Sequence, residues 1–264
     1  MEKRNIMYAN YHTHTSRCNH AKGTEREYVE AAIEAGYRVL GFADHVPHIV
    51  NDRECRMRSR MRPEETYEYM SVLTKLRDEY VNDIEIHIGF EMEYYPRYFE
   101  ETMRFLNGFD YEYLILGQHY IEDVPEGEHV MNRENSDEQL TTYVDRIING
   151  INTGKFSYVA HPDVIYYTHD DAFYKAEMKR LCRAAKEKGI PLELNCVGVK
   201  KNRCYPNDRF WRIASDVGNS VIIGVDAHSP EELLDKSTVR KCEEISRRFE
   251  LFPLRELKFR DPHG

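Results

Sequence analysis

Ile6-Met-Tyr-Ala-Asn-Tyr-His-Thr-His14 is the stretch of sequence from which the fold can be worked out. A short run of apolar and aromatic residues predicts a β-strand over Ile6–His12, and the run ends in a pair of histidines. A helical pattern follows over Glu25–Gly36, with an apolar stripe and a glycine at the position expected for a C-cap. The beginning of the chain therefore predicts one strand-and-helix unit.

The same alternation continues along the whole chain. Further strands are predicted at Arg38–Ala43, Ile84–Glu91, Glu112–His119, Phe156–His161, Pro191–Asn195 and Val221–Asp226. Further helices are predicted at Pro63–Val81, Tyr98–Asn107, Ser136–Thr153, Asp171–Lys188, Asp208–Val217 and Pro230–Phe249. Alternating strands and helices indicate parallel β/α units, and seven such units suit a closed or nearly closed barrel better than an open sheet. We expect an α/β fold with a single domain over residues 1–264, in which residues 257–264 form a loose tail.

Composition limits the possible partners. The 37 Lys and Arg against 46 Asp and Glu give a net charge of −9, which does not favour a nucleic-acid backbone as partner. The six cysteines form no C-x-x-C pair, and neither a signal peptide nor an apolar stretch of membrane-spanning length is evident. We expect a cytoplasmic protein with reduced thiols and without a nucleic-acid or membrane partner, and a homo-oligomer remains open.

Side chains that can bind metal stand at or just after six of the seven predicted strands. They are His12, His45, Glu91, His119, His161 and Asp226. The carboxyl ends of barrel strands converge on one face, and that face holds the active site. One histidine at a strand end is unremarkable, whereas six such side chains at six of the seven strands indicate a common site.

Local spacing adds three more ligands to this group. His14 is two residues from His12, His228 is two residues from Asp226, and His20 follows the first strand closely. Seven imidazoles and two carboxylates exceed the ligands of a single ion, so we expect two or three divalent ions, bridged by Glu91 or Asp226. This mixture of ligands suits Zn, Fe or Mn. Each motif alone also has a structural explanation, such as a hydrogen-bonded core histidine or a helix cap.

The remaining features are less specific. The basic loop His45–Arg62 is either a lid or rim of the site or an ordinary solvated loop. Asp44 and Asp163 lie beside predicted ligands in the sequence. Each is either a hydrogen-bond partner of an imidazole N–H group or an ordinary loop cap. The other histidines are interpreted as surface or core residues: His48, His87, His129, His169 and His263.

The motifs resemble those of the polymerase and histidinol phosphatase (PHP) superfamily. They run, in order, Tyr11-His-Thr-His-Thr15, Cys18-Asn-His-Ala21, Gly41-Phe-Ala-Asp-His-Val-Pro47, Gly89-Phe-Glu91, Leu116-Gly-Gln-His119, Ala160-His-Pro-Asp163 and Asp226-Ala-His228. Two of them, C-N-H-A and F-A-D-H-x-P, are similar to those of the monofunctional histidinol-phosphate phosphatases. The resemblance extends from about residue 8 to residue 230.

The resemblance implies a distorted seven-stranded, TIM-like (β/α)7 barrel with a trinuclear metal site. Carried over to this chain, His12, His14, Glu91 and Asp226 would hold one ion. The second would be held by Glu91 with His119 and His161, and the third by His20, His45 and His228. No metal ligand of the family pattern is missing.

The resemblance is weaker at the residues expected to bind phosphate. The family tends to place arginines after the fifth and sixth strands, but His161-Pro-Asp163 is followed by Val-Ile-Tyr-Tyr167. Arg17, Lys200 and Arg203 are the substrate-binding candidates that remain.

The expected activity is hydrolysis of a small phosphorylated metabolite, L-histidinol phosphate, in histidine biosynthesis, by a hydroxide held between metal ions. Asp226, Glu91 and His228 are the candidate catalytic residues. The alternatives are a PHP phosphoesterase acting on a nucleotide or sugar phosphate, a metal-dependent amidohydrolase, and a non-catalytic metal-binding protein. The amidohydrolases commonly have a bridging lysine where this chain has His119.

Overall fold

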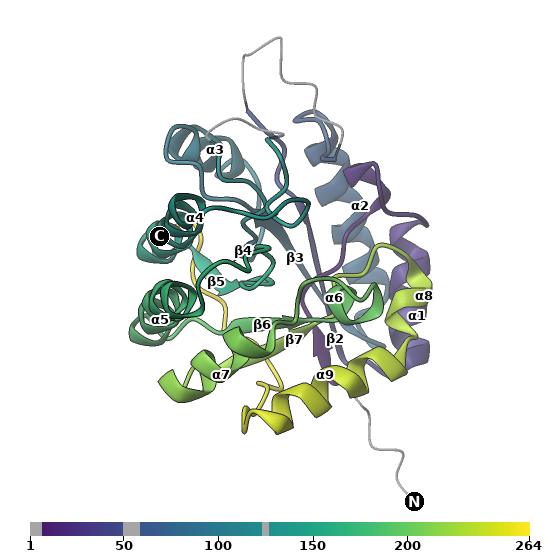
Figure 1. The fold of residues 1–264 in the computed structure, drawn as a ribbon. Helices are drawn as coiled ribbons and strands as arrows, with labels where there is room; N and C mark the ends of the chain where they lie inside the picture. The colour runs from purple at the N-terminus through teal and green to yellow at the C-terminus, as the bar shows by residue number, and fades with distance from the viewer. Residues whose placement is uncertain (1–6, 50–58, 123–126) are drawn as a thin grey trace, which may run out of the picture.

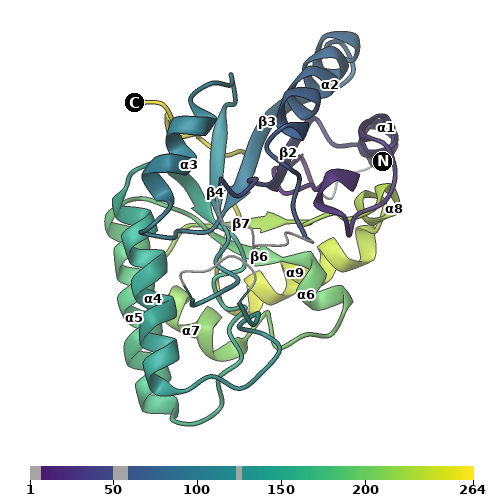
Figure 2. The ribbon, with the colours of Figure 1, turned by 90° about the horizontal axis from the view of Figure 1, so that it is seen from above.

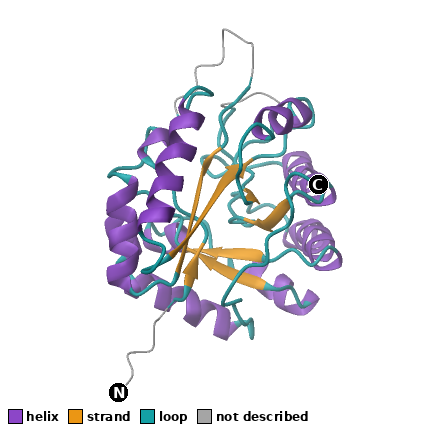
Figure 3. Cartoon of the chain, turned by 180° about the vertical axis from the view of Figure 1, so that it is seen from behind, coloured by secondary structure: helices purple, strands orange, loops and turns teal. Residues whose placement is uncertain are grey.

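The computed structural model describes residues 7–49, 59–122 and 127–264. Its strands are parallel, pair in chain order and curl into a nearly closed barrel with helices on the outside (Figures 1 and 3). The strands are β1 (Ala9–Asn10), β2 (Val39–His45), β3 (Glu85–Met92), β4 (Tyr113–Leu116), β5 (Phe156–Val159), β6 (Leu192–Asn195) and β7 (Val221–Gly224). The predicted seven-stranded α/β barrel is confirmed.

The helices connect successive strands around the outside of the barrel. They are η1 (Ser16–Cys18), α1 (Glu25–Ala35), α2 (Glu65–Glu79), α3 (Phe99–Leu106), α4 (Asp137–Asn152), α5 (Asp171–Glu187), α6 (Cys196–Lys200), α7 (Asp208–Val217), α8 (Pro230–Leu233) and α9 (Lys236–Arg248). Helices α4 and α5 lie side by side on the outer face, as Figure 2 shows. Among the described residues, no helix has the length and apolar character needed to cross a membrane.

The first β/α unit forms for local reasons. The side chain of Thr24 accepts a hydrogen bond from the main-chain N–H of Glu27, and the Glu27 carboxylate accepts one from the main-chain N–H of Thr24. This capping box satisfies two free N–H groups at the start of α1. Gly36 ends the helix with a φ of 93°, a left-handed conformation that favours glycine, so the predicted C-cap is confirmed.

The barrel closes between β1 and β7 through a short contact at their carboxyl ends. Thr13 and Ala227 form an isolated parallel bridge, in which the N–H of His14 donates to the carbonyl of Ala227 at 2.9 Å. The buried Asn10 side chain reinforces the contact by accepting from the N–H of Val225 at 2.9 Å. The closing bridge therefore places the H-x-H motif of the first strand beside the D-x-H motif of the last.

The predicted elements differ from the structure mainly at their ends. The predicted helix Pro230–Phe249 is divided into α8 and α9, because the Asp235 side chain accepts from the N–H of Thr238 and starts a new helix. The short helix α6 was not predicted. The first strand was predicted to begin at Ile6, which lies outside the described residues.

Residues 257–264 do not form the loose tail that we expected. Leu257 is buried, and the ring of Phe259 stacks on Tyr113 with the ring centroids 4.7 Å apart. The N–H of Arg260 donates to the hydroxyl of Ser157 at 3.1 Å. The segment is held because its two apolar side chains cover the amino ends of the barrel strands.

Candidate metal centre

The carboxyl ends of the strands surround a cavity of about 400 Å³. The predicted ligands that line it are His14, His20, His45, Glu91, His119, His161, Asp226 and His228. His12, the ninth, is fully buried, and its Nε2 lies 3.2 Å from the Nε2 of His14. Folding therefore brings all nine residues together.

Several subsets of these side chains are close enough to share one ion. In each group the potential ligand atoms lie within 4.8 Å of one another. The groups are His12, His14 and Asp226; His12, Glu91 and His161; His14, His45 and Glu91; and His14, Cys18 and His228. His14 belongs to three of these groups and Glu91 to two, and a carboxylate common to two groups is what adjacent bridged ions require.

Glu91 lies at the centre of the cluster. One carboxylate oxygen, Oε1, is 3.0 Å from Nε2 of His161, and the other, Oε2, is 2.9 Å from Nδ1 of His45. The two oxygens thus face two different histidines. Gly117, which follows the neighbouring strand β4, makes room for this side chain, because a Cβ there would overlap the Glu91 carboxylate.

Asp226 is the second carboxylate of the cluster. Its Oδ1 lies 3.1 Å from Nε2 of His14 and 3.5 Å from Nε2 of His12. Its backbone adopts a φ of 55°, a left-handed conformation that is uncommon for a residue with a side chain. Such strain at a strand end is typical of functional positions.

Five of the imidazoles are oriented by a hydrogen bond from Nδ1. The acceptors are the side chains of Glu193 for His12, Asp44 for His14 and Glu93 for His119, and the carbonyls of Cys18 for His20 and Asp226 for His228. Because a carboxylate or a carbonyl oxygen can only accept, Nδ1 carries a proton, and in the neutral ring Nε2 keeps its lone pair. This pattern is the usual one around histidines that bind metal through Nε2.

The charges of the site favour bound cations. Burial alone would raise the pKa of Glu91, but the nearby imidazoles of His119, His45 and His12 outweigh it and hold the pKa well below its ordinary value. Burial lowers the pKa of His12, but Glu193, Asp226 and Glu91 outweigh that effect and raise it well above its ordinary value. Ionised carboxylates beside buried rings therefore attract positive charge, either protons or metal ions.

The hydrogen bonds of the protein alone leave this centre unsatisfied. Glu91 Oε2 and Asp226 Oδ1 are buried and have no hydrogen-bond partner. The Nε2 atoms of His12 and His14 face each other at 3.2 Å. Several lone pairs therefore point to the same space without a hydrogen-bond donor, and a divalent cation would satisfy them. The mixture of imidazole and carboxylate ligands suits Zn, Fe or Mn.

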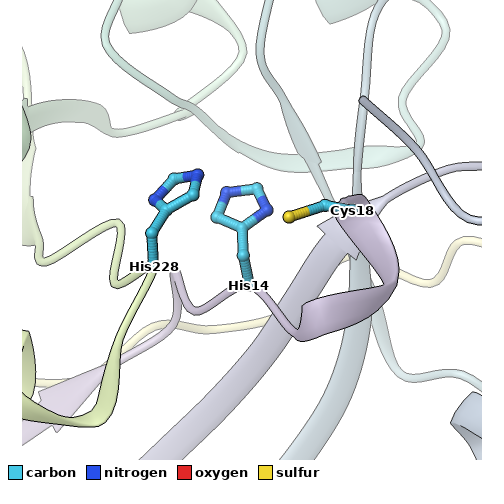
Figure 4. A group of neighbouring side chains, drawn as sticks. All are labelled: His14, Cys18 and His228. Carbon is cyan, nitrogen blue, oxygen red and sulfur yellow. The ribbon is translucent and has the colours of Figure 1, made fainter. Parts of the chain in front are cut away.

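Cys18 lies next to this centre but differs from the other members. Figure 4 shows the ring of His14 between the ring of His228 and the sulfur of Cys18. The rings of His14 and His228 stack with their centroids 4.2 Å apart. Burial raises the pKa of the Cys18 thiol, so it is uncharged and a poor ligand compared with the imidazoles around it.

Arg60 connects the loop before α2 to the metal centre. Its guanidinium and the ring of His119 both donate to the same carboxylate oxygen of Glu93. Only 3% of the surface of Arg60 is exposed. The carbonyl of Arg60 accepts from the side chain of Asn19 at 2.9 Å. The predicted lid or rim includes residues 50–58, which lie outside the described residues, and Arg60 near the end of the loop lines the cavity.

The same cavity also carries the candidate substrate contacts. Arg203 and Lys201 line it, and Arg203 also donates to the hydroxyl of Tyr205 at 3.1 Å. Two of the three predicted candidates lie elsewhere. Arg17 is paired with Glu25, and Lys200 with Glu232 at 3.1 Å, and neither lines the cavity. Helix α6 explains the difference, since its turn directs Lys200 outward and leaves Lys201 at the cavity.

His129 also lines the cavity, although its sequence position gave no indication of this. Its Nδ1 accepts from the N–H of Met131 at 3.1 Å, so the proton is on Nε2. Burial, followed by the charges of His119, His161 and Arg203, lowers its pKa to about 3. His129 is therefore a neutral hydrogen-bond donor.

The two aspartates beside the ligands have different roles. Asp44 contacts the ring of His14 at 3.4 Å and accepts from the N–H of Thr15 at 3.1 Å. Asp163 instead accepts from the N–H of Asn207 at 2.6 Å, just before α7. Burial raises the pKa of Asp163 to about 7. Asp44 is thus an imidazole partner, whereas Asp163 anchors a loop.

Sequence reasoning missed Glu93 and Glu193, the carboxylates that hold His119 and His12. The sequence feature that could have identified Glu193 is an acidic residue within an otherwise uncharged, buried strand. The fully buried run Leu192-Glu-Leu-Asn195 has no solvent for a carboxylate, so Glu193 requires a partner inside the protein.

Comparison with known proteins identifies the family of this chain. The family model for the PHP domain matches residues 10–196. The chain belongs to the PHP domain family. A probable histidinol-phosphatase of Deinococcus radiodurans is 28% identical over 84% of this chain and 86% of its own length. The histidinol-phosphatase of Bacillus subtilis is 23% identical over 82% of this chain and 92% of its own.

Solved structures of PHP proteins share the fold. A histidinol phosphate phosphatase from Lactococcus lactis, complexed with zinc, L-histidinol and phosphate, superposes with a TM-score of 0.74 and 19% identity over 95% of this chain and 98% of its own. A putative histidinol phosphatase from Listeria monocytogenes superposes with a TM-score of 0.68 and 22% identity over 85% of this chain and 96% of its own. Their agreement supports the distorted barrel expected for a PHP domain.

Proposed function

We propose that this PHP protein is a metal-dependent phosphomonoesterase that hydrolyses L-histidinol phosphate to L-histidinol and phosphate. The observation that carries the proposal is one cavity that combines two kinds of group. Eight imidazoles and carboxylates line it next to the buried His12, and Lys201, Arg203 and the neutral donor His129 line it as well. The named relatives support the choice of substrate.

The nine residues would hold two or three divalent ions, namely Zn, Fe or Mn. We assign His12, His14, Glu91 and Asp226 to one ion, Glu91, His119 and His161 to the next, and His20, His45 and His228 to the third. When bound, such ions neutralise charge on a phosphoryl oxygen and lower the pKa of water towards neutral.

The protein's own groups then have separate tasks. Asp226 Oδ1 has no hydrogen-bond partner, so it is the atom we expect to accept the proton of the attacking water and return it to the leaving alkoxide. Arg203 and Lys201 would bind phosphate oxygens, Arg203 as a fork and Lys201 as a point charge. The volume of about 400 Å³ lies in the range used by small ligands.

The test is phosphate release by the purified protein, loaded with Mn, Zn or Fe, from L-histidinol phosphate and from a panel of nucleotide and sugar phosphates. We expect the highest kcat/KM for L-histidinol phosphate. Glu91→Ala should lower kcat/KM by at least about 10³-fold, or about 4 kcal/mol of transition-state stabilisation. Glu112→Ala, which removes a carboxylate at the other end of β3 and β4, is the matched control. Full activity of Glu91→Ala would refute the proposal.

A second candidate is a PHP phosphoesterase that acts on another small phosphate ester. The observation in its favour is Val164, which lines the cavity just after the fifth strand, where the family pattern tends to have an arginine. A different ester with a higher kcat/KM in the same panel would establish this alternative.

A further inference from the structure

Glu193 is a charged residue in the interior of the barrel that does not line the cavity. It lies in β6 with 0% of its surface exposed. Burying an ionised carboxylate is costly unless it is fully hydrogen-bonded. Glu193 therefore has a role that does not involve contact with substrate.

Among the described residues, the hydrogen-bond partners of this carboxylate are all donors. Oε1 accepts from Nδ1 of His12 at 2.8 Å. Oε2 accepts from the main-chain N–H of His161 at 3.0 Å and from the side-chain amide of Asn195 at 2.9 Å. Only a group that accepts on both oxygens satisfies all three donors. A glutamine has the same shape, but its NH₂ group would face a donor on one side or the other.

The first contact fixes the tautomer of His12. Because Nδ1 donates to Glu193, the lone pair of the neutral His12 ring is on Nε2. That atom faces the Oδ1 of Asp226 at 3.5 Å and the Oε2 of Glu91 at 3.7 Å. Without Glu193, the proton of a neutral ring is free to move to Nε2, where it would block coordination.

The other contacts extend the effect to two more strands. His161 has a φ of 29°, an unusual conformation for a residue with a side chain, and its N–H is held by Glu193. In this position the ring of His161 reaches Glu91 at 3.0 Å. The amide of Asn195, which donates to Glu193, also donates to Asp226 at 3.2 Å. One buried carboxylate thus contacts, directly or through Asn195, residues from the ends of β1, β5 and β7.

The neighbouring strand is adapted to this side chain. A Cβ on Gly224 of β7 would overlap the Glu193 carboxylate, as a Cβ on Gly117 would overlap Glu91. The barrel therefore reserves space for two carboxylates, and only Glu91 lines the cavity.

We propose that Glu193 is a positioning residue of the metal centre, which sets the tautomer of His12 and holds the backbone of His161. This inference rests on the proposed function, because it assumes that the centre binds metal. Glu193 makes no contact with substrate, so its removal should weaken metal binding first and lower turnover as a consequence.

The experiment compares Glu193→Gln with Glu112→Gln. Glu112 is a matched control because it also accepts from an imidazole Nδ1, that of His87 at 2.9 Å, and from a main-chain N–H, that of Ile88 at 2.9 Å. It lies away from the cavity. Zn²⁺ affinity is measured by competition with a chromophoric chelator, and thermal unfolding is recorded with and without Zn²⁺.

We expect Glu193→Gln to lower the Zn²⁺ affinity by about 10- to 100-fold and to reduce the rise in Tm on adding Zn²⁺, whereas Glu112→Gln changes neither. A merely structural role would lower the Tm of the metal-free protein and leave its rise with Zn²⁺ unchanged, and that result would overturn the inference. Zn²⁺ affinity within twofold of wild type would do the same.

Two further outcomes are distinguishable. If Glu193→Gln does not fold, Glu193→Asp, which keeps two accepting oxygens on a shorter side chain, is compared with Glu112→Asp by the same criteria. If the wild-type protein itself binds no Zn²⁺, Mn²⁺ or Fe²⁺, the proposed function fails, and the inference that rests on it fails as well.

Discussion

Two pairs of histidine and glutamate lie at opposite ends of the barrel, and they have different environments. At the carboxyl ends, His12 and Glu193 are both 0% exposed, and the second ring nitrogen of His12 faces other acceptors. At the amino ends, the side chains of His87 and Glu112 are 16% and 31% exposed. There the second nitrogen of His87 pairs with the exposed Glu85 at 3.0 Å, and Arg77 lies 3.5 Å from Glu112.

The comparison shows that the same pair of residues can be structural or functional, depending on what surrounds it. At the amino ends, solvent and a basic side chain balance the charges, and the pair only joins neighbouring strands. At the carboxyl ends, the surrounding groups are further lone pairs, which only a proton or a metal ion can satisfy. The predictions below test whether this difference holds.

Among the variants considered below, the largest effect is expected from adding a methyl group beside the central carboxylate. Gly117→Ala should displace Glu91, because the new Cβ would overlap its carboxylate. We expect kcat/KM to fall by about 10- to 100-fold and stability by about 1–3 kcal/mol. Gly154→Ala is the control, since a Cβ there meets nothing within 4 Å. Its φ of 76° predicts a cost of about 1–2 kcal/mol in the free energy of unfolding, without a change in kcat/KM. Equal activities of the two variants would contradict the central role of Glu91.

A smaller effect is expected at the candidate substrate contacts of the cavity. Arg203→Ala should raise KM about tenfold, which corresponds to about 1.4 kcal/mol of binding energy. Lys200→Ala should leave KM unchanged, because Lys200 is paired with Glu232 outside the cavity. Steady-state kinetics with L-histidinol phosphate measures both. A larger effect of Lys200→Ala would mean that the sequence-based choice of Lys200 was right.

No change in activity is expected from a variant at the amino ends. Phe259→Ala removes the ring that stacks on Tyr113, and we expect the free energy of unfolding to fall by about 1–2 kcal/mol, since Phe259 is only partly buried. Urea denaturation measures this loss, and kcat/KM per folded molecule should equal that of wild type. A loss of turnover would show that the two ends of the barrel are coupled.

Most of the metal centre was predictable because its ligands occur at strand ends. His12, His45 and Glu91 are close to the ends of apolar runs, and parallel strands bring such ends to one face whatever the detailed packing. Lys200 was misjudged because the short helix α6 gives no clear pattern in the sequence, and its turn decides which of two adjacent lysines faces the cavity. His129 was missed because a loop residue gains its position only from contacts such as that with Met131.

The sequence by itself determined the order of strands and helices and the nine side chains that meet at the carboxyl ends. It did so through short-range patterns, namely apolar runs, caps and the spacing of histidines. The tertiary structure alone decided which nitrogen of His12 carries the proton, because that depends on a carboxylate 181 residues away. It also decided the place of the last residues, since Phe259 finds a partner only in the assembled barrel. Tautomers and long-range contacts depend on groups that are brought together only by folding.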